Sequence, residues 1–359
     1  MKRTVAAVAG AVAVSLLAGC AADGRHTRPA GSTASFTSSV LAVQTQAIAP
    51  TSTAPTSNHP VDPPVLVRPG RPRPTLPPQP VGGSASIAGC PLFPPSNPWR
   101  QSIAQAQVNP RSAAWVASIG GSRLLHPDFG SNPSYGIPYS TVPAGQPKLP
   151  VHITGYPAES DPGPYPIPSG ARIEAGSDAH LLVASADCHL YELYGATHGT
   201  GGWSAQSGAI FDLKSNALRP TGWTSADAAG LPILPGLVRR DEVQSGQIDH
   251  ALRFTIARTQ RGFISPATHQ AGSTTDPNVA PMGARFRLKA SFDLAGYHGA
   301  ARVILQCLKT YGMFVADNGS NWYLSGATDT GWDDADLDQL KQVPGLAFEA
   351  IDSGPVRTG

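Results

Sequence analysis

The sequence predicts a mainly-β (α+β) domain with a few short helices, arranged as a β-sandwich or jelly roll behind a disordered tether. Gly and Pro are abundant, at 38 and 36 of 359 residues, and only 14% of the residues are charged. Short aromatic and β-branched runs are separated by turn residues, which is typical of sheet proteins. A long stretch rich in Pro, Ser and Thr precedes these runs and has too few large apolar residues to form a core.

The chain begins with the features of an export signal. Lys2 and Arg3 precede an apolar stretch over residues 4–17, about as long as a signal-peptide core and too short to span a bilayer. It ends in Leu17-Ala18-Gly19-Cys20, which resembles a bacterial lipobox. The resemblance implies cleavage after residue 19 and attachment of lipid to Cys20, which would anchor the protein at the extracytoplasmic face of the cell membrane. The alternative is an ordinary secretory signal with an incidental cysteine.

Four segments follow from this pattern. Residues 1–19 are the signal peptide, residues 20–88 the tether, residues 89–353 one globular domain and residues 354–359 a flexible tail. Loss of Lys2 and Arg3 from the 26 basic residues leaves 24, against 24 acidic ones, so the mature chain is nearly neutral. We therefore expect no nucleic-acid partner, and we expect a monomer whose membrane contact is the N-terminal lipid.

Within the domain, the loop-rich region 90–170 is followed by clearer elements. Alternating apolar residues predict strands over 247–257 and 285–290, and "LAFEAI" at 346–351 predicts a last strand. Residues 300–312 show helical spacing and end at a glycine. "DADLDQLKQV" predicts a short helix capped by Asp333. Asn318-Gly319 predicts the type I′ turn of a hairpin within 313–326.

Three cysteines remain after Cys20. Cys307 lies on the apolar face of the predicted helix, so we expect a buried thiol. Cys90 opens the domain and Cys188 begins a probable strand in "ADCHLYELY". In an oxidising compartment these observations predict a Cys90–Cys188 disulfide that holds the start of the domain, although three cysteines allow three pairings.

Several segments together resemble a family of exported bacterial proteins of unestablished reaction, some of which carry appended carbohydrate-binding modules. The resemblance spans residues 90–352 and rests on these segments: "CPLFPPSNPW", "HPDFG", "ESDPGPYPIP", "LYELYGA", "GWTSADAAGLPILPGLVRRDEV", "HALRFT", "PMGARFRLKASFD" and "ADNGSNWYLSG". It implies a secreted setting and suggests glycans, and it supplies no catalytic residues. No HExxH, GxSxG, P-loop, paired CxxC or strand-linked GxGxxG is present, so we expect neither a metal nor a cofactor.

Basic residues alternate along two predicted strands. Arg253 lies on the polar face of one strand, and Arg285, Arg287 and Lys289 lie on that of another. If the strands are neighbours, these cations form a site for carboxylate or sulfate. The alternative is an ordinary solvated face paired with acids. A lyase acting on a uronic-acid polymer would use His269 as base beside Arg285 or Arg287.

Carboxylates offer a second catalytic hypothesis. Glycoside hydrolysis needs two carboxyl groups, which Asp212 could supply with Glu242 or with Glu192. Alternatively, Asp212 caps a turn and Glu242 pairs with the arginines before it. Trp203 and Trp322 stand in turn-rich contexts and are candidate platforms for sugar rings, although core packing explains many tryptophans.

These patterns predict a lipid-anchored protein that acts on a polysaccharide, as a glycoside hydrolase or a polysaccharide lyase. The competing class is a non-catalytic glycan-binding or structural protein of the cell envelope. A cleft with convergent carboxylates or a His–Arg pair would favour the enzyme, and a flat aromatic or basic face would favour the binding protein.

Overall fold

The computed structural model describes residues 85–358. The predicted signal peptide, the lipidation residue Cys20 and the tether up to residue 84 lie outside the described residues. Ala85 and Ile87 are buried, and Arg357 exchanges both backbone hydrogen bonds with Phe263. The folded part therefore extends a few residues beyond 89–353 at both ends. No helix within residues 85–358 is long and apolar enough to cross a membrane.

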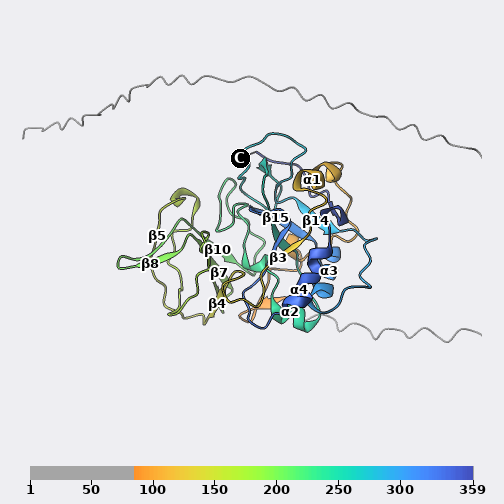
Figure 1. Ribbon diagram of the computed structural model, residues 1–359. Coiled ribbons are helices and arrows are strands. Elements are labelled where there is room, and N and C mark those ends of the chain that lie inside the picture. The colour runs from red at the N-terminus through yellow and green to blue at the C-terminus, as the bar shows by residue number, and fades with distance from the viewer. Residues whose placement is uncertain (1–84, 359) are drawn as a thin grey trace, which may run out of the picture. The chain divides into compact units, whose positions relative to one another are not determined.

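The predicted mainly-β fold with few short helices is confirmed, and Figure 1 shows the helices gathered away from the three-stranded sheet. A six-stranded sheet has the order β17-β14-β15-β11-β16-β3. Its strands are β3 (His126–Asp128), β11 (Leu252–Ile256), β14 (Arg285–Leu288), β15 (Met313–Asn318), β16 (Tyr323–Ser325) and β17 (Phe348–Ala350). The α-helices are α1 (Ser112–Ile119), α2 (Arg240–Ser245), α3 (Gly299–Thr310) and α4 (Asp334–Asp338).

Smaller sheets complete the fold. The four-stranded sheet β10-β7-β6-β4 contains β4 (Tyr139–Val142), β6 (Leu181–Ser185), β7 (His189–Tyr194) and β10 (Ser207–Asp212). The sheet β5-β9-β8 contains β5 (Val151–Ile153), β8 (Thr197–Gly199) and β9 (Gly202–Ala205). Two pairs are β1 (Ser86–Ile87) with β2 (Cys90–Pro91), and β12 (Gln260–Phe263) with β13 (Pro281–Met282). Single turns of 3-10 helix are η1 (Pro98–Arg100), η2 (Pro157–Glu159), η3 (Leu234–Gly236), η4 (Gln339–Gln342) and η5 (Gly345–Ala347).

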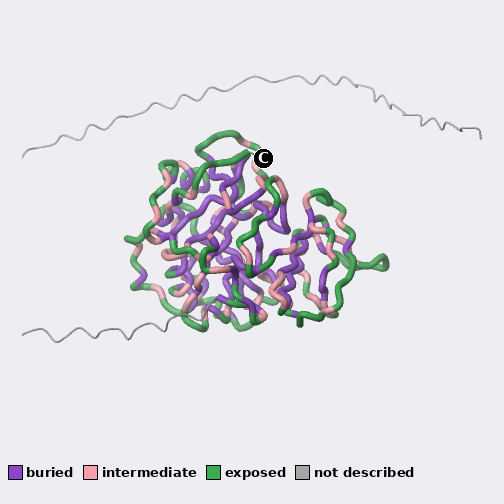
Figure 2. Tube along the Cα trace, turned by 180° about the vertical axis from the view of Figure 1, so that it is seen from behind, coloured by how far each residue is buried: buried purple, intermediate pink, exposed green. Residues whose placement is uncertain are grey.

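The four-stranded sheet separates two apolar cores, because neighbouring residues of a strand point to opposite faces. Leu182 and Ala184 of β6 belong to the larger core, which also contains the apolar side chains of the six-stranded sheet and α3. Leu181 and Val183 belong to a smaller core, which they share with Val151 of the three-stranded sheet. The unbroken apolar run of β6 is thus explained by burial on both faces, and Figure 2 shows the buried stretches running through both parts.

The C-terminal helices are confirmed, but the predicted hairpin is wrong. Helix α3 covers nearly the predicted residues, and the Asp333 carboxylate caps α4 by accepting from Ala335 N and Asp336 N. Strands β15 and β16 are consecutive in sequence, yet both pair with β11, which lies between them. Asn318-Gly319 therefore begins the connection that passes over the end of β11 from β15 to β16. It does not form a tight turn between two paired strands.

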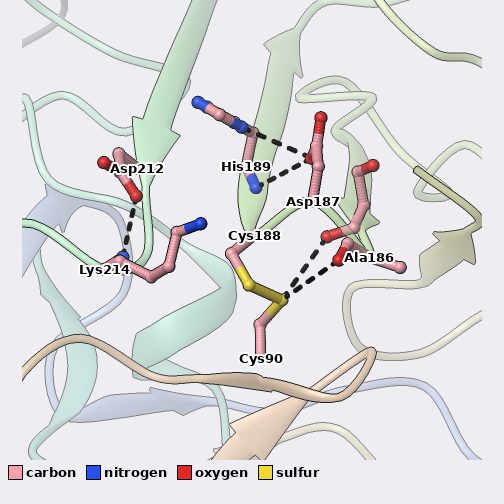
Figure 3. Close-up of a disulfide and its surroundings, with 8 residues drawn as sticks. Cys90, Ala186, Asp187, Cys188, His189, Asp212 and Lys214 are labelled. Atoms are coloured by element: carbon pink, nitrogen blue, oxygen red, sulfur yellow. Dashed lines mark hydrogen bonds and ion pairs between the residues drawn. A yellow bond between two sulfur atoms is a disulfide. The ribbon is translucent and has the colours of Figure 1, made fainter. Parts of the chain in front are cut away.

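The predicted disulfide is confirmed. Cys90 and Cys188 are joined, with 5.3 Å between their Cα atoms and a sequence separation of 98 (Figure 3). Cys188 lies in the turn between β6 and β7 and has a φ of 72°, a left-handed conformation that suits a tight turn. The bond ties the first strand pair to the four-stranded sheet. Cys307 is the free, buried cysteine among the described residues.

We predict that replacing both Cys90 and Cys188 by Ala lowers the free energy of unfolding by about 4–5 kcal/mol, because an unfolded loop of this length gains entropy when released. Urea unfolding with and without reductant measures the effect. Reductant should lower the midpoint of the parent protein and leave that of the double variant unchanged. Cys307→Ala is the matched control and should keep the full response to reductant. An equal response in the double variant would contradict the prediction.

Candidate active site

A cleft of about 290 Å³ opens between the six-stranded sheet and the loops that lead into the four-stranded sheet. Its walls come from residues 134–137, from residues 174–180 and from the end of β15 with the following residues 318–320. Four acidic residues line it: Asp128, Glu174, Asp178 and Asp317. The cleft is therefore polar and acidic, and buried charged side chains beneath it fix its geometry.

A buried ion pair forms its floor. Arg253 of β11 donates from Nη2 and Nε to the two carboxylate oxygens of Asp227, at 2.8 and 3.1 Å, and from Nη1 to Ser325 Oγ at 2.6 Å. Both charged side chains are almost completely buried. The nearby Asp227 charge outweighs desolvation and raises the pKa of Arg253, so the guanidinium stays charged. This two-pronged contact fixes the loop that carries Asp227 against the central strand of the larger sheet.

Asp317 stands beside this pair at the end of β15. The pairing of β11 with β15 shifts by one residue here, because Phe254 pairs with Val315 but Thr255 pairs with Asp317. Such a bulge bends the strand and redirects its side chains. The pKa of Asp317 is raised to about 7, mainly because burial desolvates its carboxyl and also because Asp227 lies within hydrogen-bonding reach. At pH 7 about half of the molecules therefore carry a proton on Asp317, and the fraction rises as the pH falls.

Glu174 and His180 form a second charged pair at the cleft wall. Glu174 Oε2 accepts from His180 Nδ1 and from the backbone N–H of His180, while His180 Nε2 lies 3.0 Å from the carbonyl of Ala226. Both ring nitrogens thus face acceptors, which requires a proton on each. Burial alone would lower the pKa of His180, but the hydrogen bond and charge of Glu174 raise it. The resulting imidazolium links Glu174 to the Asp227 loop.

Glu192 supports the same loop from inside the four-stranded sheet. Its carboxyl oxygens accept from the backbone N–H groups of Ile233 and Leu234 at 2.9–3.0 Å, and its side chain is fully buried. Burial raises the pKa of Glu192 to about 7, although the two N–H donors oppose the shift. Glu192 was considered as a catalytic carboxyl from the sequence, but its position is that of a buried support for the segment that leads into η3.

A second hollow of about 220 Å³ adjoins the first and shares Asp178, Asp317 and Asn318 with it. Tyr156, Tyr194 and His269 line its other side. His269 Nδ1 lies 2.7 Å from the carbonyl of Ala228, and Nε2 lies 3.8 Å from Glu159. The predicted base His269 is therefore in the cleft region, but its neighbours are a carbonyl and a carboxylate and not Arg285 or Arg287.

The predicted row of cations does not form a joint anion site, and of the alternative, a solvated face paired with acids, only the acid pairing is present for Arg287, which lies opposite Glu349 on β17. Arg285 and Arg287 are buried, and β15 separates their strand from that of Arg253. Arg285 donates only to backbone carbonyls, those of Pro98, Gln101 and Tyr311. Arg287 pairs with Glu349 and donates to the carbonyls of Ile103 and Ala106. Lys289 lies beyond the strand and donates to Leu346 O. Strand β14 is covered on both faces, so its basic side chains donate hydrogen bonds to the carbonyl groups of the covering loops and not to solvent.

The carboxylates proposed from the sequence do not converge. Asp212 is exposed at the end of β10, near the disulfide, where it accepts from the backbone N–H of Lys214 at 2.8 Å (Figure 3). Glu242 of α2 is buried and pairs with Arg239 and His250 at 2.8 and 3.1 Å. Burial disfavours its charge, but His250 and Arg239 lower the pKa of Glu242. The turn-capping and arginine-pairing alternatives therefore describe these two residues.

The two tryptophans differ in exposure. Trp322 is fully buried and stacks on Phe254 and Phe348, with ring centroids 5.5 and 5.2 Å apart, so it is not a sugar platform. Its φ of 61° is rare for a large side chain and is held by this packing. Trp322 thereby anchors the loop after Asp317. Trp203 of β9 is partly exposed and packs on His198, with centroids 4.7 Å apart.

Among the central residues of the cleft, local patterns point to Arg253 but not to Asp227, Asp317, Glu174 or His180. Asp317 falls within the segment 313–326 that is predicted as a hairpin, and Asp227 falls within a segment that carries the family resemblance. One signal was present: "IEAGSDAH" places two acids and a histidine directly before the fully apolar "LLVAS". Charged residues directly beside a buried strand lie where the core meets the surface or a cleft. The sequence pattern of acids and a histidine before an apolar strand therefore indicates Glu174 and His180 as candidate site residues.

Comparisons with protein-family models, with curated proteins and with solved structures found no match. Within residues 85–358, no group of three or more His, Cys, Asp and Glu side chains is placed to hold a metal ion. The chemistry of the cleft must therefore be inferred from its own residues.

We predict that the free energy of unfolding falls between pH 5 and pH 8. The pKa values of Glu192 and Asp317 are both raised to about 7, so between their ordinary values and pH 7 the folded protein binds more protons than the unfolded chain. Stability is then lost as the pH rises, by about 2–3 kcal/mol for Glu192 alone. Acids with lowered pKa values, such as Glu242, titrate below this window. Urea unfolding at several pH values measures the change.

Glu192→Gln is the informative variant, since its amide oxygen can still accept from the two N–H groups but the side chain cannot ionise. It should reduce the pH dependence to the part that Asp317 contributes and leave stability at pH 5 nearly unchanged. Glu192→Ala should instead be destabilised at every pH, because buried donors lose their acceptor. An undiminished pH dependence in Glu192→Gln would show that Glu192 does not cause it.

Proposed function

We propose that the protein is a glycoside hydrolase that acts on a polysaccharide, with Asp317 as the proton donor and Glu174 as the second carboxylate. The observation that carries this proposal is the raised pKa of Asp317, about 7, in a cleft that other carboxylates also line. Glycosidases pair one protonated carboxyl with one ionised carboxylate. The family resemblance, which suggests glycans, points to the same substrate class.

The residues of the cleft fit the steps of this reaction. Asp317 gives its proton to the glycosidic oxygen as the bond to the anomeric carbon breaks. Glu174 either attacks that carbon or takes a proton from the water that attacks it. Its Oε2 is held by His180, and no protein donor within the described residues contacts Oε1. Burial and, to a lesser extent, charge repulsion from Asp227 keep the proton on Asp317, while Arg253 holds Asp227 in place.

The same contacts weigh against the lyase alternative. A lyase needs a cation that neutralises the uronate carboxylate, and the arginines that suggested one are occupied. Arg253 is bound to Asp227, and Arg285 and Arg287 bind carbonyls or Glu349. A non-catalytic glycan-binding protein is the second candidate, favoured by the tyrosines of the two hollows, Tyr135, Tyr156, Tyr194 and Tyr323. Tyrosine rings stack on sugars whether or not a bond is cleaved.

We predict that Asp317→Asn lowers the rate of polysaccharide hydrolysis at least about 100-fold, because an amide cannot donate the proton. Release of reducing ends measures the rate. Glu174→Gln should have a similar effect, and activity of the parent protein should decline as the pH rises above about 7, where Asp317 loses its proton. Asp212→Asn, which changes an exposed turn residue, is the matched control and should remain active. Full activity in Asp317→Asn would overturn the assignment.

We also propose that the protein is exported and held at the extracytoplasmic face of the cell membrane by lipid on Cys20. The order of basic residues, apolar core, small residues and cysteine supports this, because it is the order of a lipoprotein signal. Residues 20–84 would then separate the catalytic domain from the membrane.

Cys20→Ala tests the anchor. We expect the parent protein to be found in the membrane fraction and to be extracted from it by detergent. We also expect the parent protein to incorporate labelled fatty acid. The variant should incorporate none, because it lacks the thiol that accepts the lipid. Cys307→Ala is the control and should label as the parent does. Equal labelling of the Cys20 variant would contradict the proposal.

A further inference from the structure

Asp317 lies at the junction of two hollows. The first, of about 290 Å³, and the second, of about 220 Å³, share Asp317 together with Asp178 and Asn318. The proton donor thus belongs to the wall that the two hollows share, with one hollow on each side. An enzyme that removes terminal sugars would instead need its acid near the closed end of a single pocket.

Each hollow has its own aromatic side chains. Tyr323 lines the first hollow and is stacked on His126, with ring centroids 4.1 Å apart. Tyr135 also lines it, and its hydroxyl forms a hydrogen bond of 2.8 Å with His126 Nε2. Tyr156 and Tyr194 line the second. Tyr156 is 46% exposed, so its ring is accessible to a ligand. Rings on both sides of the acid can bind sugar units on both sides of the cleaved bond.

The charges that line the cleft restrict which class of polymer can bind. The cations of the first hollow are Arg253 and His180, and both are bound to carboxylates of the protein. Asp128 and Asp178 add negative charge at its wall and at the junction. A polyuronate or a sulfated chain would meet this acidic wall without a free cation, and it would be repelled. Neutral chains and chains with amino groups meet no such cost.

We propose that a neutral or amino-sugar polysaccharide binds across both hollows and is cleaved at an internal bond beside Asp317. This inference rests on the proposed hydrolase function and adds the cleavage mode and the substrate class. It assigns the first hollow and the second hollow to sugar units on opposite sides of the broken bond.

The test uses the full chain with xylan, mannan, linear arabinan, mixed-linkage β-glucan and chitosan, and with polygalacturonate as the charged counterpart. Viscosity and reducing ends are followed together, and products are sized by chromatography. We expect an early fall in viscosity and oligosaccharides of several lengths from at least one of the first five polymers, and none from polygalacturonate. Release of single terminal sugars at constant viscosity would overturn internal cleavage but keep the hydrolase. Cleavage of polygalacturonate would overturn the charge argument.

A variant on each side of the acid tests the assignment of the hollows. With a hexasaccharide of the cleaved polymer, labelled at its reducing end, Tyr156→Ala and Tyr323→Ala should shift the cleavage position in opposite directions and lower kcat/KM about fivefold each. Leu346→Ala, at an exposed site away from the cleft, is the control. Unshifted positions in both variants would overturn the two-sided site. No cleavage of any polymer by the parent protein would overturn the proposed function and this inference with it.

Discussion

The fold of the cleft depends on the ion pair of Asp227 with Arg253. Two buried charges cost several kcal/mol of desolvation, so such a pair adds little net stability, but losing one partner would leave the other charge buried and unpaired. The bidentate contact therefore permits one position of the Asp227 loop against β11. His180 donates to the carbonyl of Ala226 in this loop, and Glu192 holds the residues that follow it. Three ionisable side chains thus converge on one segment: Arg253 from β11, Glu192 from β7 and His180 from the loop before β6.

This arrangement also affects the protonation of Asp317. Burial is the main cause, because desolvation disfavours the ionised carboxyl, and charge repulsion from the neighbouring Asp227 adds to it, so that the pKa of Asp317 rises to about 7. Arg253 holds Asp227 in place beside Asp317. The same shift that suits Asp317 to donate a proton lowers stability at higher pH. The proposed activity therefore carries a cost in stability.

The sheets and the disulfide hold these cleft residues in fixed positions relative to one another. The four-stranded sheet lies between two cores, and the disulfide ties the first strand pair to the turn between β6 and β7. The aromatic stack of Trp322 with Phe254 and Phe348 holds the residues after Asp317. The cleft loops thus have buried anchors, which is how a loop-rich site can keep a fixed geometry.

Local sequence patterns determined the fold class, helix α3 and the Asp333 cap, because periodicity and capping act over short distances. The Cys90–Cys188 pairing could be predicted because three cysteines allow only three pairings, and the apolar helical position of Cys307 favours this one. Tertiary structure alone decided which charges are buried and which face the cleft. Arg285 and Arg287 alternate as an exposed face would, yet loops of residues 98–106 cover them and supply their acceptors. Asp227, Arg253 and Asp317 lie up to 90 residues apart. The parallel pairing of β11 with β15 brings Arg253 near Asp317, and the buried ion pair with Arg253 adds Asp227. No local pattern encodes such contacts between distant residues.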